Sequence, residues 1–337
     1  YHKLEIGSEV LLWKIDSTQM YFSNVTGSGK TPSNFQSQDF FEPGELEKYT
    51  NVADFNPIAV LSLYCERNKV TGMDAEDLAR ACNKNYTEET IKGTLYSMME
   101  DGFVFYDENH HWVEMKPKTT LYVKANRKIS DYDKISFNSL QPNGANGVLD
   151  MNKNTINING VDKIVVSDSN DVIFFPNESD LQLAKGRDIK FSGLLHGGRA
   201  DILAKDFQFD YEKFRVHIKD GDSLLIHVPI MSKDGFNTPQ LKPVRTFICK
   251  VSGDFIVDAA KNKSSRVRLW KYPTLKTTEP SFTFYESPKI HNNAYKRDVF
   301  YFKLDTFTLD SLLCFDINGI RFPGTFVSGG IMPEMKQ

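Results

Sequence analysis

Residues 148–218 decide the fold class of this chain, and they read VLDMNKNTININGVDKIVVSDSNDVIFFPNESDLQLAKGRDIKFSGLLHGGRADILAKDFQFDYEKFRVHI. Turn-forming Asp, Asn, Gly or Pro residues separate short runs of β-branched and aromatic residues: Ile156 and Ile158, Ile164 to Val166, Val172 to Phe175, Ile189 and Phe191, Phe207 and Phe209, and Phe214, Val216 and Ile218. Short strands with frequent turns are typical of all-β folds. The stretch therefore predicts a mainly β protein with layered sheets, either solenoid-like or sandwich-like.

The composition is that of an ordinary globular protein. Of the 337 residues, 40% are hydrophobic and 25% are charged, and the formal net charge is −3. Such a small net charge gives no general attraction to nucleic acid or to anionic lipid. No apolar run reaches the roughly 18 residues that a membrane-spanning helix needs. The chain begins and ends in runs that resemble strands, so we interpret it as a section of a longer protein.

Three segments follow from the pattern of hydrophobic residues. Residues 1–50 predict strands up to about residue 25, followed by a polar loop over residues 27–48. Residues 51–118 change to helical spacing. Residues 119–337 return to β structure, beginning with Leu121-Tyr122-Val123. We therefore expect a helical insert within one β region that joins residues 1–50 to residues 119–337.

The insert contains three predicted helices, each with a recognisable start. Asn56-Pro57, Asp74 and Thr87 have the form of helix N-caps. On the third helix, the residues at helical spacing are Ile91, Leu95, Met98 and Met99. A hairpin over residues 103–115 follows. Three short helices and a hairpin are the order of elements in a winged helix, so we expect a small winged-helix-like module.

The charge of this module argues against DNA binding. Residues 51–118 contain seven basic and twelve acidic side chains, a net charge of −5. The third helix, which would enter the DNA groove, begins with Glu88-Glu89. Because phosphate contacts dominate affinity for DNA, an acidic reading helix would be repelled. We therefore expect protein contact and no nucleic-acid partner, with a DNA-binding regulator as an alternative.

One candidate ligand site is the sequence His196-Gly197-Gly198-Arg199. Its backbone N–H groups would converge beside a cationic side chain, which is the form of an anion-binding nest. Glycines at such a position more often serve the geometry of a turn.

A second candidate site contains Asp168 and Asp171, together with Asp180. Their carboxylate oxygens suit Ca²⁺, although the segment lacks the ligand order and the glycine of an EF-hand loop. Asp and Asn side chains that bond to their own backbone in turns are the more common explanation.

The sequence contains no signature of a metal site, a cofactor site or a catalytic centre. The four cysteines form no CxxC pair, and no histidine lies at ligand spacing from them, so neither zinc nor another cofactor is expected. Cys65 and Cys82 fall on predicted helix faces that would be buried. GxSxG and HExxH motifs do not occur. The sequence leaves enzymatic activity undecided and favours a non-catalytic role.

Several segments carry a resemblance to a family: VSDSNDVIFFP (166–176), DIKFSGLLHGGRADILAKDFQFDYEKFRV (188–216), NKSS (262–265), YKRDVFYFKLDTFTLDSL (295–312) and FPGTFVSGGIMPEM (322–335). With WKIDS (13–17) and the helical segment, they resemble a group of very large, uncharacterised β-rich proteins of Bacteroidetes bacteria. This resemblance implies a section of a cell-envelope protein, in the periplasm or associated with the outer membrane. It carries no activity over to any residue.

We therefore expect a non-catalytic scaffold section for protein–protein interaction, whose partner is another protein or the remainder of a larger chain. The alternative is a polysaccharide-binding or polysaccharide-active β-solenoid, in which Trp270, Tyr272 and Tyr285 would form a sugar platform. Core packing is the more common role of such aromatic residues.

Overall fold

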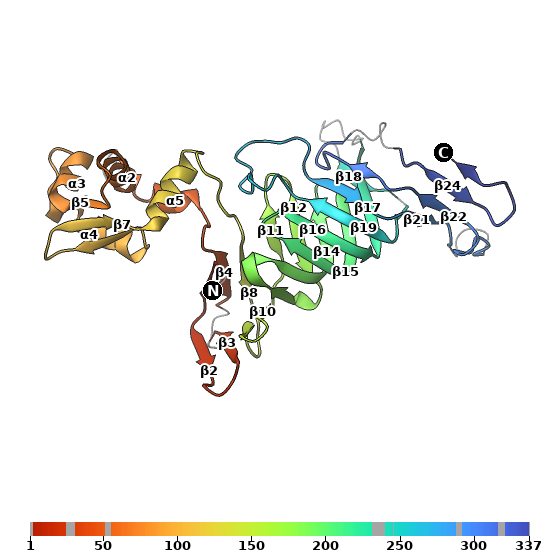
Figure 1. Cartoon of the computed structure of the whole chain (residues 1–337), viewed down its shortest axis with the longest axis horizontal. Helices are drawn as coiled ribbons and strands as arrows, with labels where there is room; N and C mark the ends of the chain where they lie inside the picture. Colours follow the sequence, from red (N-terminus) through yellow and green to blue (C-terminus); the bar gives the residue numbers. More distant parts are fainter. Residues whose placement is uncertain are drawn as a thin grey trace. The chain divides into compact units, whose positions relative to one another are not determined.

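The computed structural model of the chain (Figure 1) contains more strand than helix, 40% against 18%. It has several sheets, none of them closed, so the expectation of a mainly β protein is confirmed. The residues that the structure describes are 3–24, 31–50, 55–230, 240–244, 246–287, 292–315 and 321–336.

The chain divides into two compact units. The β unit comprises Tyr1–Gln38 and Ile135–Gln337, and the helical unit comprises Asp39–Lys134. The helical unit interrupts the β unit in sequence and is wider at both ends than the expected segment 51–118. Residues 39–50 and 119–134 therefore fold with the helices.

The described residues of the β unit form three sheets. The small sheets have the orders β1-β4-β8 and β21-β22-β24-β25, with the bounds β1 (Leu4–Gly7), β4 (Ser33–Ser37), β8 (Ser136–Ser139), β21 (Ser281–Phe284), β22 (Tyr301–Leu304), β24 (Gly324–Val327) and β25 (Met335–Lys336). The strands of the 15-stranded sheet are β2 (Val10–Trp13), β3 (Gln19–Ser23), β9 (Gly147–Asp150), β10 (Thr155–Ile158), β11 (Ile164–Ser167), β12 (Val172–Pro176), β13 (Leu181–Leu183), β14 (Ile189–Gly197), β15 (Ala200–Asp210), β16 (Arg215–Gly221), β17 (Ser223–Ile230), β18 (Gln240–Pro243), β19 (Val251–Ile256), β20 (Thr274–Thr277) and β23 (Thr308–Leu309). Two 3₁₀ turns, η2 (Asn177–Ser179) and η3 (Lys185–Arg187), flank β13.

The hairpin of β14 and β15 belongs to two branches of the large sheet. The first residues of β14 pair with β13, and its residues from Gly193 to Gly197 pair with β12. Likewise, the start of β15 pairs with β17 and its end pairs with β16. The register between β14 and β15 shifts between Phe191 and Gly193, which is the mark of a β-bulge. Bulges bend strands, so the hairpin changes partners where it bends.

Stacked aromatic rings cross the hairpin on its buried face. The ring of Phe191 lies 4.7 Å from that of Phe174 and 4.8 Å from that of Phe207, in nearly parallel orientation. All three side chains are buried, and they come from the neighbouring strands β12, β14 and β15. The strand runs predicted within residues 148–218 are confirmed as β10, β11, β12, β14, β15 and β16, except that Phe214 lies in the turn before β16.

Every ladder between the strands that the structure describes is antiparallel. Antiparallel pairs are joined by short hairpins, whereas a parallel solenoid needs crossover connections. The antiparallel pairing of the described strands therefore favours the sandwich-like over the solenoid-like alternative.

The polar loop expected over residues 27–48 is wrong from residue 33 onward, and residues 27–30 lie outside the described residues. The strand β4 runs between β1 and β8, and the helix α1 (Pro43–Glu47) follows it. The buried face of β4 consists of Ser33, Phe35 and Ser37. Only one of these three is apolar, so this strand lacks the alternation that predicts a strand.

The remaining elements of the helical unit are α2 (Pro57–Asn68), β5 (Gly72–Asp74), α3 (Ala75–Cys82), α4 (Glu88–Glu100), β6 (Val104–Asp107), β7 (Trp112–Met115) and α5 (Pro117–Asn126). The predicted caps are confirmed: Asn56 and Asp74 accept N–H bonds at the starts of α2 and α3, and Thr87 forms a capping box with Thr90. The predicted burial of Cys65 and Cys82 is confirmed. Of the helical stripe predicted on α4, Ile91, Leu95 and Met98 are buried, and Met99 is partly buried.

The strand expected at Leu121-Tyr122-Val123 is wrong, because these residues lie in α5. Pro117 occupies the first helical turn, where its missing N–H costs nothing. Tyr122 and Val123 are buried in the core of the helical unit. Tertiary packing thus overrides the β preference of this Thr-, Tyr- and Val-containing run.

Substitution of Gly193 tests how much the close packing at the bulge contributes to the stability of the β unit. Its φ is +140°, and a Cβ there would lie 2.2 Å from the carbonyl oxygen of Phe175. Overpacking and backbone strain each cost about 1–3 kcal/mol, so Gly193→Val should lower the free energy of unfolding of the β unit by about 3 kcal/mol. Chemical denaturation followed by circular dichroism measures this change.

Gly7→Val is the matched control, since a Cβ at Gly7 of β1 would make only an ordinary contact, 3.7 Å from Asn34 Cβ. Its free energy of unfolding should stay within about 1 kcal/mol of the parent value. Equal effects of the two substitutions would contradict the role assigned to Gly193.

Candidate functional site

The pairing of β12 with β14 brings residues of the two predicted sites together in one polar cluster. His196 Nδ1 lies 2.6 Å from Asp201 Oδ1, and its Nε2 lies 3.2 Å from Asp171 Oδ2. His227 Nε2 lies 3.6 Å from the other oxygen of Asp201. His196, which was predicted to help bind an anion, is therefore hydrogen-bonded to Asp171, which was predicted to help bind a cation. No sequence pattern pointed to Asp201 or His227.

The pKa of His196 is raised above its ordinary value. The hydrogen bond to Asp201 is the largest cause, and the bond to Asp171 acts in the same direction. Partial burial of the imidazole opposes both effects. The cluster therefore favours an imidazolium held between two carboxylates.

Two backbone N–H groups of the expected anion-binding nest already donate to carbonyl groups of the chain. The N–H of Gly198 donates to the carbonyl of Asp171, and the N–H of Arg199 donates to the carbonyl of Leu312. The Arg199 guanidinium donates to the carbonyl of Phe315 at 2.9 Å. Gly198 has φ +61°, and a Cβ there would lie 2.8 Å from the Leu312 carbonyl oxygen. The glycine thus serves the turn and its close contact with another segment.

The residues of the expected cation site come from two segments. Asp168 and Asp171 lie in the turn between β11 and β12, whereas Asp180 follows η2. Across the described part of the chain, no group of three or more His, Cys, Asp or Glu residues is arranged to hold a metal ion.

Loss of the His196 charge should change how stability depends on pH. Because its folded-state pKa is raised above the unfolded value of about 6.5, the imidazolium stabilises the fold fully below about pH 6.5. This stabilisation is lost as the pH rises through the raised pKa. His196→Gln should therefore cost about 1 kcal/mol near pH 5.5 and markedly less near pH 8.5, as measured by denaturant unfolding.

His217→Gln is the control, since His217 is 54% exposed and contacts one carboxylate, that of Asp254, at 3.1 Å. His217→Gln should lower the free energy of unfolding by less than His196→Gln does at every pH. A cost of His196→Gln that did not depend on pH would contradict the bridging role.

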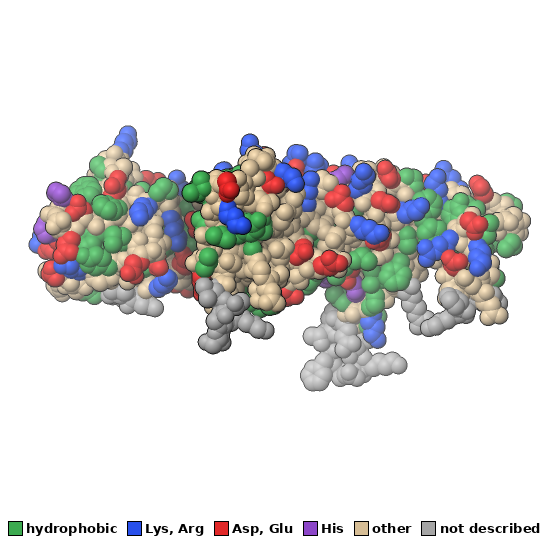
Figure 2. Space-filling view, turned by 90° about the horizontal axis from the view of Figure 1, so that it is seen from below, with side chains coloured by type: hydrophobic (Ala, Val, Ile, Leu, Met, Phe, Trp, Pro, Cys, Tyr) green, Lys and Arg blue, Asp and Glu red, His purple; other side chains and the backbone are tan. Residues whose placement is uncertain are grey.

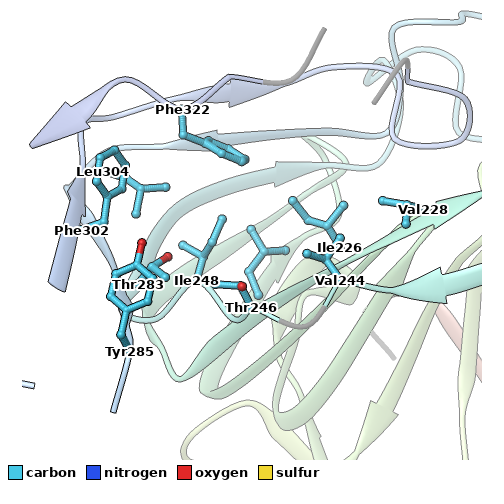
Figure 3. A pocket seen from close by; sticks show the side chains of 11 residues that line it. Ile226, Val228, Val244, Thr246, Ile248, Thr283, Tyr285, Phe302, Leu304 and Phe322 are labelled. Carbon is cyan, nitrogen blue, oxygen red and sulfur yellow. The ribbon is translucent and has the colours of Figure 1, made fainter. Parts of the chain in front are cut away.

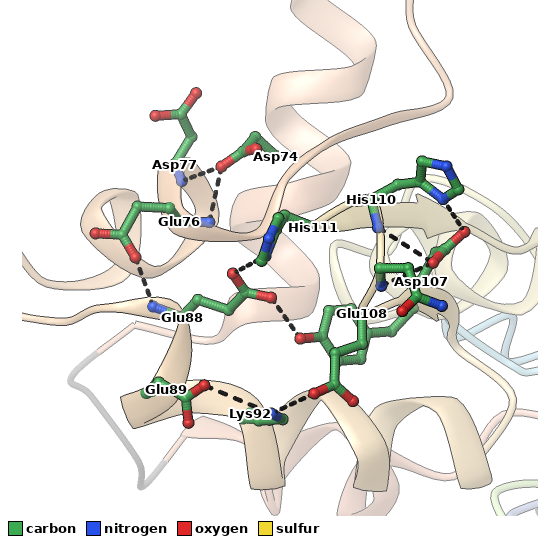
Figure 4. A network of polar contacts seen from close by, with 12 residues as sticks. Asp74, Glu76, Asp77, Glu88, Glu89, Lys92, Asp107, Glu108, His110 and His111 are labelled. Carbon is green, nitrogen blue, oxygen red and sulfur yellow. Dashed lines mark hydrogen bonds and ion pairs between the residues drawn. The ribbon is translucent and has the colours of Figure 1, made fainter.

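The helical unit contains a network of carboxylates around the start of α4 (Figure 4). Glu88 accepts hydrogen bonds from the Tyr106 hydroxyl and lies 2.6 Å from His111 Nδ1. The Glu88 side chain is only 14% exposed. Glu76 Oε2 accepts the backbone N–H of Glu88, which ties α3 to α4. Burial and then the bond to Glu88 raise the pKa of Tyr106, so the phenol stays protonated.

A second part of this network joins α4 to the turn between β6 and β7. Lys92 Nζ lies 2.5 Å from Glu108, whose other oxygen accepts the Tyr96 hydroxyl. The only basic side chain in this part of the network is thus already paired with an acidic one. On the face drawn in Figure 2, basic and acidic side chains are interspersed, and no continuous basic stripe that would follow a nucleic-acid backbone is visible.

Glu88→Ala should destabilise the helical unit by about 1–3 kcal/mol, because it leaves the buried Tyr106 hydroxyl without its acceptor. Glu89→Ala is the neighbouring control. The Glu89 side chain is 81% exposed, so its removal should change stability by less than about 0.5 kcal/mol. Helical circular dichroism during denaturation measures both. Similar small effects would show that the network contributes little.

An apolar cavity of about 320 Å³ lies in the β unit between β17, β21 and β22 (Figure 3). Its lining includes Leu224, Ile226 and Val228 of β17, Phe302 and Leu304 of β22, and Phe322. The hydroxyl-bearing members are Thr246, Thr283 and Tyr285, and no lining residue is charged. Volumes of roughly 300–1,000 Å³ are usual for small-molecule sites. Sequence periodicity did not predict this cavity, because strands far apart in the chain form it.

The edge strand β2 exposes four consecutive apolar residues. It pairs with β3 and has no second partner among the strands that the structure describes. Leu11 is 60% exposed, Leu12 52% and Trp13 48%. Proteins usually protect such edges with charge, proline or a covering segment.

Two of the three aromatic residues considered as a sugar platform, Trp270 and Tyr285, lie in separate environments. Trp270 is 59% exposed, and the guanidinium of Arg268 lies 4.0 Å from its ring centroid. Tyr285 lines the apolar cavity and packs against Phe300 and Phe326. Neither environment favours a shared stacking surface for sugar rings.

The class that the fold defines is a mainly β protein whose sequence is interrupted by a helical unit. Comparisons of the chain with protein-family models, with curated proteins and with solved structures found no match. Among the described residues, no helix combines the length and the apolar character needed to cross a membrane.

Proposed function

We propose that this chain is a non-catalytic interaction section of a larger cell-envelope assembly, and that a protein partner adds a strand to the edge of β2. The observation that carries the proposal is the row of exposed apolar side chains on that open edge. Strand addition supplies backbone hydrogen bonds, and apolar side chains on both faces supply buried area. The partner is another protein or the remainder of a longer chain.

The register of β2 explains why its exposure points to a partner. Leu11 lies opposite Phe22, and Trp13 lies opposite Met20. Met20 and Phe22 pack against the core of the β unit. Directly opposite residues project from the same face, so Leu11 and Trp13 continue the core face beyond the covered region. A partner strand with its own apolar face would complete that core.

The support for a cell-envelope location is the resemblance of residues 166–176 and 188–216 to the Bacteroidetes proteins.

For the helical unit, we propose a winged-helix-like module that contacts protein. The order α2-β5-α3-α4-β6-β7, with the sheet order β5-β7-β6, supports this interpretation. The carboxylates at the start of α4 and in the turn between β6 and β7 support protein contact over DNA binding, since a phosphate backbone would meet Glu88 and Glu108.

A double substitution on β2 tests the proposed function. Leu11→Lys with Trp13→Lys places two charges on exposed positions, so the melting temperature of the isolated chain should change by less than about 3 °C. In the protein isolated from its own cells, the same change should abolish the assembled species in sedimentation-velocity experiments.

Leu203→Lys is the control, because Leu203 is 45% exposed on the inner strand β15 and should leave assembly intact. An unchanged sedimentation coefficient for the β2 variant would overturn the proposed function.

A further inference from the structure

The apolar cavity of the β unit has a cationic residue beside one end. Lys242 of β18 lies directly opposite Val228 of β17, and Val244 is two residues further along the chain. Val228 and Val244 both line the cavity. Directly opposite residues, and residues two apart on one strand, project from the same face of a sheet. The Lys242 side chain therefore leaves the sheet on the face of the cavity.

Lys242 is exposed and forms no ion pair with any residue that the structure describes. Its ammonium group is available to an external anion. The cavity itself has no charged lining residue, and the hydroxyl of Thr283 is already directed to the carbonyl of Phe247 at 3.5 Å. The site thus combines an uncharged apolar interior with one free positive charge at its end.

We propose that this cavity binds a single-chain amphiphile with an anionic head, a medium-chain fatty carboxylate. The tail would lie among Leu224, Ile226 and Leu304, and the carboxylate would face Lys242. This ligand site is separate from the β2 edge. In the large sheet, β2 stands at one end of the strand order, whereas β17, which lines the cavity, pairs with β15. It adds a small-molecule function to the proposed protein interaction.

The chemistry of the lining sets the expected selectivity. Burial of each methylene group contributes about 0.8 kcal/mol, which corresponds to about a fourfold gain in affinity per methylene until the cavity is full. Because its volume of about 320 Å³ lies at the lower end of small-molecule sites, one short chain fills it. The ion pair at an exposed lysine adds a smaller factor, about threefold.

Calorimetric titration of the whole chain with dodecanoate, below its micelle concentration, tests the proposal. We expect saturable binding of one dodecanoate per chain, and octanoate should bind much more weakly. Dodecyltrimethylammonium, which has the same tail and a cationic head, should bind at least threefold more weakly than dodecanoate. Vesicles of phosphatidylglycerol should not bind, which separates a free amphiphile from a lipid surface. Binding to vesicles without binding of dodecanoate would overturn the proposal.

Two variants locate the site. Lys242→Glu should lower dodecanoate affinity at least threefold and reverse the preference between the two head groups, whereas the matched surface variant Lys190→Glu should change neither. Val228→Trp should fill the cavity and abolish binding, and the melting temperature reports whether the variant is folded. Unchanged binding by folded Val228→Trp would contradict the cavity as the site, and unchanged head preference in Lys242→Glu would contradict the role of the lysine.

Discussion

A close backbone contact at Gly193 organises the β unit. There β12 approaches β14 so closely that a side chain at residue 193 would overlap the carbonyl of Phe175. The adjacent bulge lets one continuous hairpin pair with β13 and β16 toward one end and with β12 and β17 toward the other. Branching at this point keeps the aromatic rings of β12, β14 and β15 on one buried face. The stacked rings and the bulge therefore stabilise each other.

The candidate sites follow from this branching. The pairing of β12 with β14 brings Asp171 to His196, and the pairing of β15 with β17 brings Asp201 toward His227. The same β17 strand carries one wall of the apolar cavity on neighbouring residues. At the far end of the sheet, β2 continues the core face, and no segment among the described residues covers it. The strands of the β unit thus carry three features: the polar cluster, the apolar cavity and the open edge of β2. We propose binding at the cavity and at the edge.

Much of the fold could be predicted from the sequence, because local signals were strong where one face is apolar. Short apolar runs marked β10, β11, β12, β14, β15 and β16, and N-caps marked α2, α3 and α4. The prediction failed at β4, whose buried face carries serines, and at α5, whose Tyr122 and Val123 favour strands until packing places them in a helix. The candidate sites were harder. His196 and Asp171 lie 25 residues apart, and their contact depends on strand register, which no local pattern contains.

The branching of the hairpin is the central claim of this account, and nuclear Overhauser effects across β14 test it most directly. In one deuterated sample with protonated amides, methyl groups and Phe rings, cross-strand effects should join Leu183 to Ile189 and Phe174 to Leu195, because β13 and β12 are both neighbours of β14. Effects from the whole length of β14 to only one of these two strands would contradict the account.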